Sequence, residues 1–237
     1  MLYWLYELFN INLFQYITVR AGFAFFIALV LTMFFMPRFI RWAQKTSSVQ
    51  PINDWAPDTH QAKAKTPTMG GIVFIMATII ASLMSIKLFD TYALGGLLTL
   101  LFFSLIGFQD DYSKIKQNAN LAGLTARMKL LFQFIAAGVV ALFLCNFSDM
   151  NTDLYVPFVK SPLFDMGYYA VFFWALIMVA ASNAVNLTDG LDGLATVPSI
   201  FALFTLGALV YITGNAVISN YLLLPNFPVG EVAIIAS

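Results

Sequence analysis

Long apolar runs separated by short polar segments dominate the pattern along the chain. A helix that crosses a membrane needs about 20 mostly apolar residues, because the hydrocarbon core is about 30 Å thick. The runs that qualify are 21–40, 70–87, 91–109, 128–147, 168–186 and 194–213. A seventh run begins near Val229 and reaches only Ser237, so we expect the chain to be a C-terminally truncated part of a longer protein.

These runs predict an all-α fold, a polytopic transmembrane helical bundle with six full spans and the start of a seventh. No fixed-period repeat divides the chain, and we expect a single membrane domain over residues 1–237. Residues 1–19 contain no Lys or Arg but several Tyr, Trp and Phe. Because Tyr and Trp favour the membrane–water interface, we interpret 1–19 as an interfacial segment.

The composition agrees with a membrane protein, since 60% of the residues are hydrophobic, 10% are charged and the mean hydropathy is +0.82. An ordinary soluble domain is only about 45–50% apolar. The formal net charge is zero, which indicates no bulk attraction to nucleic acid. Cys145 is the only cysteine, so a disulfide within the chain and a cysteine-based zinc site are both excluded.

The basic residues gather in or beside alternate loops between the predicted spans. Because Lys and Arg are enriched in cytoplasmic loops, loops 41–69, 110–127 and 187–193 are predicted to be cytoplasmic and the N-terminus external. The basic residues on the cytoplasmic side are Arg38, Arg41, Lys45, Lys63, Lys65, Lys114, Lys116, Arg127 and Lys129. The basic residues on the other side are Arg20, Lys87 and Lys160.

The first of three polar clusters on the cytoplasmic side is HQAKAKTPTMGG, at residues 60–71. Thr66 or Thr68 can cap the helix that follows. A helix N-terminus with Lys63 and Lys65 just before it is suited to binding phosphate. The alternative is an ordinary capped helix start with two lysines placed by the positive-inside rule.

The second cluster is DDYSK, where the third span meets the cytoplasm. Asp110 and Asp111 repel each other unless they share a cation or a proton, and their hard oxygen ligands suit Mg²⁺. Asp110 and Lys114 share one face if the helix continues, so that they could hold metal and phosphate together. The alternative is a solvated loop that ends a helix.

The third cluster is NAVNLTDGLDG, at residues 183–193. Asn183, Asn186, Asp189 and Asp192 recur every three residues, which on a helix makes one slowly drifting polar stripe. Polar groups inside a membrane are costly, and they usually face a cavity or a partner. The alternative is that the asparagines join two helices and the aspartates lie in an ordinary turn.

With these motifs the sequence resembles the phospho-N-acetylmuramoyl-pentapeptide transferases (translocase I), in the superfamily that transfers N-acetylhexosamine 1-phosphate to polyprenyl phosphate. The resemblance rests on His60 and Lys63 before TPTMGG, then IGFQDDYSK and NLTDGLDGLA, in the family's order. Lys65 and INDWAPDTH depart from the family's usual residues. The resemblance implies about ten spans, with a Met-Gly-Asp motif and a histidine-rich loop beyond Ser237.

The resemblance implies that undecaprenyl phosphate attacks the β-phosphate of UDP-N-acetylmuramoyl-pentapeptide, which gives lipid I and UMP with Mg²⁺ as cofactor. It implies Asp110 as the base or positioning residue, with Asp111 close to the metal. The residues implied for substrate or phosphate binding are His60, Lys63, Thr68, Lys114, Asn186, Asp189 and Asp192. Asp111 and Asp189 are implied as metal ligands. In phosphoryl transfer of this kind the protein contributes mainly by positioning the reactants and by neutralising the charge of the phosphates.

Two other functions fit parts of the pattern. A sister enzyme that transfers N-acetylglucosamine 1-phosphate to the same lipid would share the aspartates but not TPTMGG. An ion-coupled transporter would place ionisable groups near the bilayer midplane, whereas these aspartates lie at span ends. We therefore expect a multi-pass protein of the bacterial inner membrane with its active site facing the cytoplasm, and leave open whether it forms a homodimer.

Overall fold

Antiparallel helices make up the fold, which is seen in a computed structural model that describes residues 1–45, 69–117, 123–156, 159, 161–189 and 193–237. The elements are α1 (Leu2–Phe9), the 3₁₀ helix η1 (Asn12–Gln15), α2 (Ile17–Lys45), α4 (Gly71–Ser85), α5 (Thr91–Gln117), α6 (Ala126–Phe147), α7 (Tyr169–Thr188), α8 (Thr196–Thr213), α9 (Ala216–Tyr221) and α10 (Val232–Ala236). Each of the six predicted spans is a helix, so the polytopic helical fold is confirmed. In the described residues the only β pairing is an isolated bridge between Asp153 and Asp165.

Of the six helices that correspond to the predicted spans, five are long and apolar enough to cross a membrane, and α4 is the exception. Helix α4 has 15 residues, which at 1.5 Å each span about 22 Å. Gly70 occupies its N-cap position, and Thr66 and Thr68, the predicted capping residues, lie outside the described residues, so their capping role stays a prediction.

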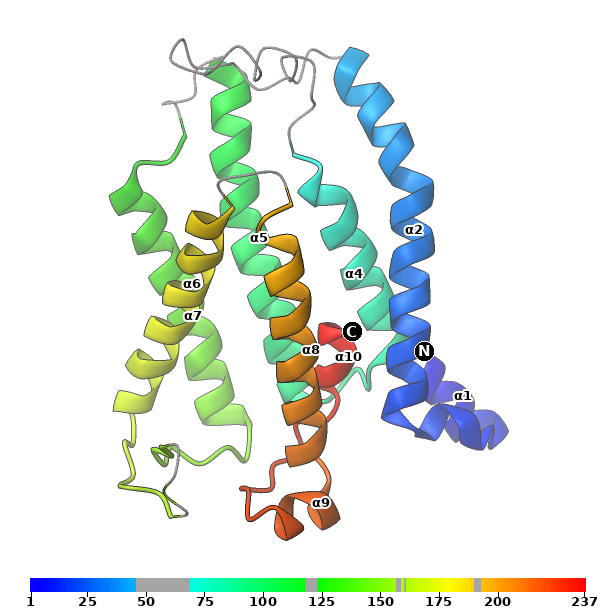
Figure 1. Ribbon diagram of the computed structural model, residues 1–237, viewed down its shortest axis with the longest axis vertical. Coiled ribbons are helices and arrows are strands. Elements are labelled where there is room, and N and C mark those ends of the chain that lie inside the picture. Colours follow the sequence, from blue (N-terminus) through cyan, green and yellow to red (C-terminus); the bar gives the residue numbers. More distant parts are fainter. Residues whose placement is uncertain (46–68, 118–122, 157–158, 160, 190–192) are drawn as a thin grey trace.

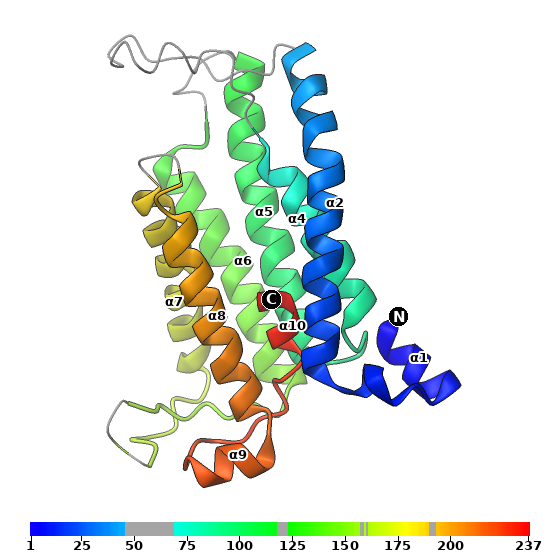
Figure 2. The ribbon, with the colours of Figure 1, turned by 45° about the vertical axis from the view of Figure 1, so that its right-hand side comes forward.

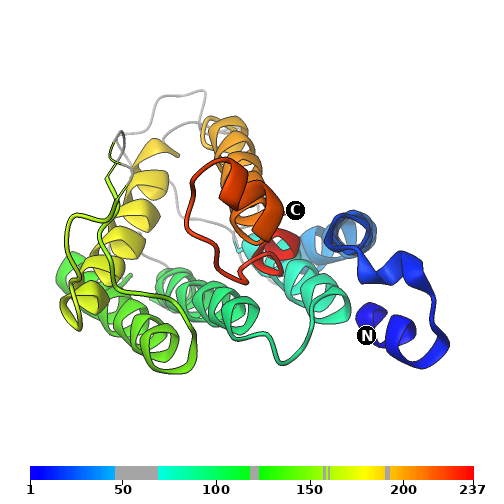
Figure 3. The same cartoon turned by 90° about the horizontal axis from the view of Figure 1, so that it is seen from below.

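The helices form an arc in the order α2, α4, α5, α6 and α7, and α8 stands opposite the arc (Figure 3). Short α10 lies inside, packed against α8, α2 and α5 (Figure 2). The seventh apolar run thus begins as a helix, α10. Between α8 and α10 the chain forms α9 and turns back toward the bundle, which the pattern did not predict. Gly96 permits the close approach of α10, because a Cβ there would lie 2.9 Å from Ile235 Cδ1.

Small residues fill the contacts between helices, and large apolar residues face outward. Ala81, Ala93 and Ala137 are almost fully buried, whereas Phe26 and Phe204 are mostly exposed. Because lipid tails are as apolar as Leu, membrane helices associate through close packing of small residues rather than by hiding large ones. This distribution agrees with a bundle whose outer surface meets lipid.

The described parts of the three sequence motifs, which are Met69–Gly71, Asp110–Lys114, Asn183–Asp189 and Gly193, lie at one end of the bundle, where α2, α5 and α7 finish and α4, α6 and α8 begin (Figure 1). We call this the motif end and the other the distal end. Residues 1–16 form α1 and η1 beside the distal end, a placement compatible with the predicted interfacial segment. The predicted loop bounds were wrong in part, because α5 continues to Gln117 and α2 to Lys45.

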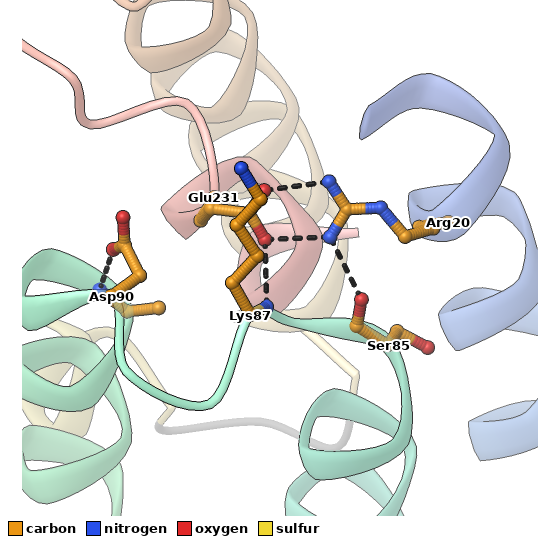
Figure 4. Close-up of polar contacts among 6 residues, drawn as sticks. Arg20, Ser85, Lys87, Asp90 and Glu231 are labelled. Carbon is orange, nitrogen blue, oxygen red and sulfur yellow. Dashed lines mark hydrogen bonds and ion pairs between the residues drawn. The ribbon is translucent and has the colours of Figure 1, made fainter. Parts of the chain in front are cut away.

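A buried ion pair joins distant parts of the chain near the distal end (Figure 4). Arg20, on α2, donates two hydrogen bonds to Glu231, of 2.6 and 2.7 Å, and a third of 2.9 Å to the carbonyl of Ser85. The backbone N–H of Lys87 also donates to Glu231. Arg20 is 1% exposed, and its hydrogen bonds fix α10 to α2 and to the turn after α4.

Candidate active site

The end of α5 carries a compact charged cluster. Lys114 Nζ lies 2.7 Å from Asp110 Oδ2 and 3.3 Å from Asp111 Oδ1. The helix continues through these residues because the i,i+4 and i,i+3 ion pairs support it. The prediction that Asp110 and Lys114 share a face is therefore confirmed, and the alternative of a loop at these positions is wrong.

Asp110 and Asp111 differ in their surroundings. The side chain of Asp110 is 13% exposed, and its Oδ1 accepts a hydrogen bond of 2.8 Å from the backbone N–H of Leu124. The side chain of Asp111 is 45% exposed, and Lys114 is its one hydrogen-bond partner among the described residues. Asp111 is thus the more accessible carboxylate, and Asp110 is the one held in place.

The segment before α6 fixes Asp110 from the other side, which the sequence did not predict. A Cβ on Gly123 would lie 2.6 Å from Asp110 Oδ1, so only glycine lets the backbone approach this closely. Thr125 caps α6 by accepting a hydrogen bond from Met128 N–H. Lys129, in the next turn, adds a small electrostatic attraction to the Asp110 carboxylate. From the sequence, Lys129 was predicted only to be a cytoplasmic basic residue, and no local signal indicated that it lies near Asp110.

The polar stripe at the end of α7 is divided between two roles. Asn183 points toward α6 and donates a hydrogen bond of 2.8 Å to Gln133 Oε1, which matches the alternative that an asparagine joins two helices. Asn186 and Asp189 are exposed at the motif end. Asp189 occupies the C-cap of α7, where its backbone N–H bonds to Val185. The two exposed side chains remain available to a ligand.

A groove between α4 and α5 connects two of the motifs. It has a volume of about 330 Å³, and its lining includes Met69 and Gly71 from the first motif and Asp111 from the second. The remaining lining is largely apolar, with Ile75 and Leu105 among its residues. The structure therefore places the end of TPTMGG on the same groove as Asp111. His60, Lys63, Thr68 and Asp192 lie outside the described residues, so their roles stay predictions.

The donor set around α5 is suited in part to a divalent cation. Asp110 and Asp111 together carry two negative charges against the single charge of Lys114, and carboxylate oxygen is the ligand that Mg²⁺ prefers. Within the described residues no three His, Cys, Asp or Glu side chains are grouped as a metal site. Asp111 fits as one ligand, and the assignment of Asp189 to the same ion stays a prediction.

Comparison with known proteins identifies two matching family descriptions. Residues 93–229 match glycosyl transferase family 4, and residues 63–75 match signature 1 of the phospho-N-acetylmuramoyl-pentapeptide-transferases. The signature therefore covers Lys63 and Thr68, and the wider match covers the second and third motifs.

Curated relatives carry the same description over the whole chain. The phospho-N-acetylmuramoyl-pentapeptide-transferase of Sulfurimonas denitrificans is 65% identical over 237 residues, which are 100% of this chain and 67% of the relative. The proteins of the same name from Nitratiruptor and Aliarcobacter butzleri are each 58% identical, again over 100% of this chain and 67% of the relative.

Proposed function

The chain belongs to the phospho-N-acetylmuramoyl-pentapeptide transferase family, and from this premise we propose that it transfers phospho-N-acetylmuramoyl-pentapeptide from its UDP carrier to undecaprenyl phosphate. The products are lipid I, the lipid-linked pyrophosphate of peptidoglycan synthesis, and UMP. The observation that carries the proposal is the 65% identity of the entire chain to a relative of that name. The signature at residues 63–75 favours this substrate over the N-acetylglucosamine-1-phosphate sister reaction.

In the proposed reaction an oxygen of undecaprenyl phosphate forms a bond to the β-phosphorus of the nucleotide substrate. The bond from that phosphorus to the bridging oxygen breaks, and UMP leaves with that oxygen. Asp110 positions the attacking phosphate or takes its proton, and the hydrogen bonds from Leu124 and Lys114 hold the carboxylate in place. Such fixed groups accelerate phosphoryl transfer through positioning and charge stabilisation.

Lys114 and Asp111 suit the charge changes of this reaction. In the free protein both aspartates engage the Lys114 ammonium, and an incoming phosphate would compete with them for it. Mg²⁺, bound by Asp111 and substrate phosphates, would supply neutralisation of the pyrophosphate charge. Exposed Asn186 and Asp189 at the end of α7 would contact the uridine-diphosphate side of the substrate.

The proposal is tested by UMP release from the product of the complete reading frame that contains this chain, purified in detergent. We expect release only when UDP-N-acetylmuramoyl-pentapeptide, undecaprenyl phosphate and Mg²⁺ are all present. Omission of each component in turn is the control. Turnover of UDP-N-acetylglucosamine in place of the muramoyl substrate would assign the sister reaction instead.

We also propose that the motif end faces the cytoplasm of a bacterial inner membrane. The support is the position of Lys45, Lys116 and Lys129, which all lie at the motif end, where positively charged residues mark the cytoplasmic side. A reporter that works only in the cytoplasm should therefore be active when it is fused near Lys116. A reporter that works only outside the cytoplasm should be active when it is fused near Asp153. The opposite pattern would separate the site from cytosolic nucleotide and refute the orientation.

A further inference from the structure

We propose that Gln133 is a positioning residue for the proposed transferase reaction, acting through Asn183 on the last turn of α7. The inference rests on the proposed function, because Asn186 and Asp189 in that turn are its substrate-side residues. Gln133 belongs to none of the three sequence motifs. It lies on α6, the helix between the aspartate cluster of α5 and the polar stripe of α7.

The contacts of Gln133 are few, buried and directed at α7. Gln133 is 3% exposed. Its Oε1 accepts the hydrogen bond of 2.8 Å from Asn183 Nδ2, and its Nε2 donates a longer one of 3.5 Å to Ser182 Oγ. Asn183 Nδ2 also donates a hydrogen bond of 2.8 Å to the carbonyl of Val179. Because both polar partners on α7 are consecutive residues, the amide fixes one side of that helix.

Apolar packing and a polar contact together hold α7 against α6. The apolar contact between α6 and α7 is made by Ala137, Ala175 and Val179, with Phe134 and Met178 beside them. Small side chains allow the two helices to approach closely. The hydrogen bond between Gln133 and Asn183 adds a directional contact, which limits the rotation of α7 about its own axis. A buried amide between apolar helices is otherwise costly.

The same helix carries the second connection to the site. Just before α6, the backbone N–H of Leu124 donates its hydrogen bond of 2.8 Å to Asp110 Oδ1, and Gln133 lies about two turns into the same helix. Asn183 precedes Asn186 by three residues, so the hydrogen bond lies about one turn from the exposed part of the stripe. Gln133 thus sets the distance between the nucleotide-side groups of α7 and the carboxylates of α5. Misplacement of about 1 Å is enough to lower a rate considerably.

The kinetic test compares Gln133→Met, which keeps the length but removes the acceptor, with Gln133→Glu, which keeps an oxygen for Asn183. We expect Gln133→Met to raise KM for the UDP substrate about tenfold and to leave KM for undecaprenyl phosphate unchanged. Gln133→Glu should recover most of this loss. Asn183→Leu should cost at least as much, and the double variant with Gln133→Met no more than Asn183→Leu alone, because the two residues act as one unit.

A matched control and a readout without catalysis complete the experiment. Val140 lies on the same helix α6 and is 1% exposed, so Val140→Ala removes two buried methyl groups without touching Gln133 or Asn183. It should leave both KM values unchanged. Nitroxide labels at Lys116→Cys on α5 and Leu187→Cys on α7, with Cys145→Ser, report the distance between the two helix ends. We expect Gln133→Met to shift or broaden this distance distribution, and Gln133→Glu to restore it.

The outcomes separate this inference from the proposed function. An unchanged distance distribution in Gln133→Met overturns the positioning role, whether or not the protein releases UMP. A shifted distribution in a protein that releases no UMP supports the positioning role and refutes the transferase proposal. Equal losses in Gln133→Met and Val140→Ala, or additive effects of Gln133→Met and Asn183→Leu, would reduce Gln133 to a packing residue.

Discussion

Replacement of Asp110 by Asn tests the proposed site most directly, because it removes one charge and hardly changes shape. The Leu124 N–H can still bond to the amide oxygen, but Lys114 loses its 2.7 Å partner. A hydrogen bond to a charged group is worth about 1.5–3 kcal/mol. Because Lys114 is 28% exposed and keeps Asp111 nearby, we expect a loss at the lower end, about 1–2 kcal/mol of unfolding free energy.

The expected loss of rate is larger than this loss of stability can produce. Removal of a general base costs about 10²–10⁴-fold, which at 1.36 kcal/mol per tenfold is about 3–5 kcal/mol of activation free energy. A protein with about 5–15 kcal/mol of stability stays folded after losing 1–2 kcal/mol. UMP release per folded molecule should therefore fall by at least about 10²-fold in Asp110→Asn.

The measurement pairs initial rates of UMP release with thermal unfolding and size-exclusion profiles of the same preparation. Ser113→Ala is the control, since Ser113 lies on the same turn of α5 and, among the described residues, forms hydrogen bonds only with Gln109. We expect it to retain the wild-type rate. Near-normal turnover in Asp110→Asn would refute the catalytic assignment, and a rate loss equal to the loss of folded protein would leave Asp110 a structural role.

Three further predictions follow from the described contacts. Asp111→Asn should raise the Mg²⁺ concentration needed for half-maximal UMP release, and excess Mg²⁺ should recover part of the activity; no change in the Mg²⁺ titration would remove Asp111 from the metal site. Arg20→Met should lower stability by about 3–5 kcal/mol, because Glu231 stays buried without its partner, and the double variant Arg20→Met/Glu231→Met should regain most of that in thermal melts. Burial, with the charge of Glu231, raises the pKa of Asp90 above its ordinary value of 3.8. The folded state therefore holds this proton more tightly than the unfolded state, so wild-type stability should fall as the pH rises from 3.8 through the raised pKa, and Asp90→Asn should show less of that fall.

The order of helices and the identity of the paired aspartates were accessible from the sequence for a physical reason. A bilayer forces each span into a helix of about 20 apolar residues, so runs such as 91–109 and 128–147 identify helices without knowledge of their neighbours. Charged residues are excluded from the same runs, so DDYSK stands out at the end of one. The bounds were less accurate, because α5 continues as a helix to Gln117, beyond its apolar part, and carries the ion pair between Asp110 and Lys114 in that extension.

The contacts across the bundle were decided by the tertiary structure. Gly123 and Leu124 reach Asp110 from a separate segment, and nothing in their local pattern indicates a ligand for a carboxylate. Asn183 could as well have faced a substrate as another helix, and only the position of Gln133 on α6 settles its direction.

By itself, then, the sequence determined which segments form long apolar helices and which polar motifs stand at their ends, because both depend on the preference of each residue for lipid or water. Only the tertiary structure decided that Arg20 meets Glu231 and that α10 returns between α2 and α8. Those contacts depend on how helices pack side by side, and in lipid that choice depends on small residues and single directional hydrogen bonds rather than on hydrophobicity.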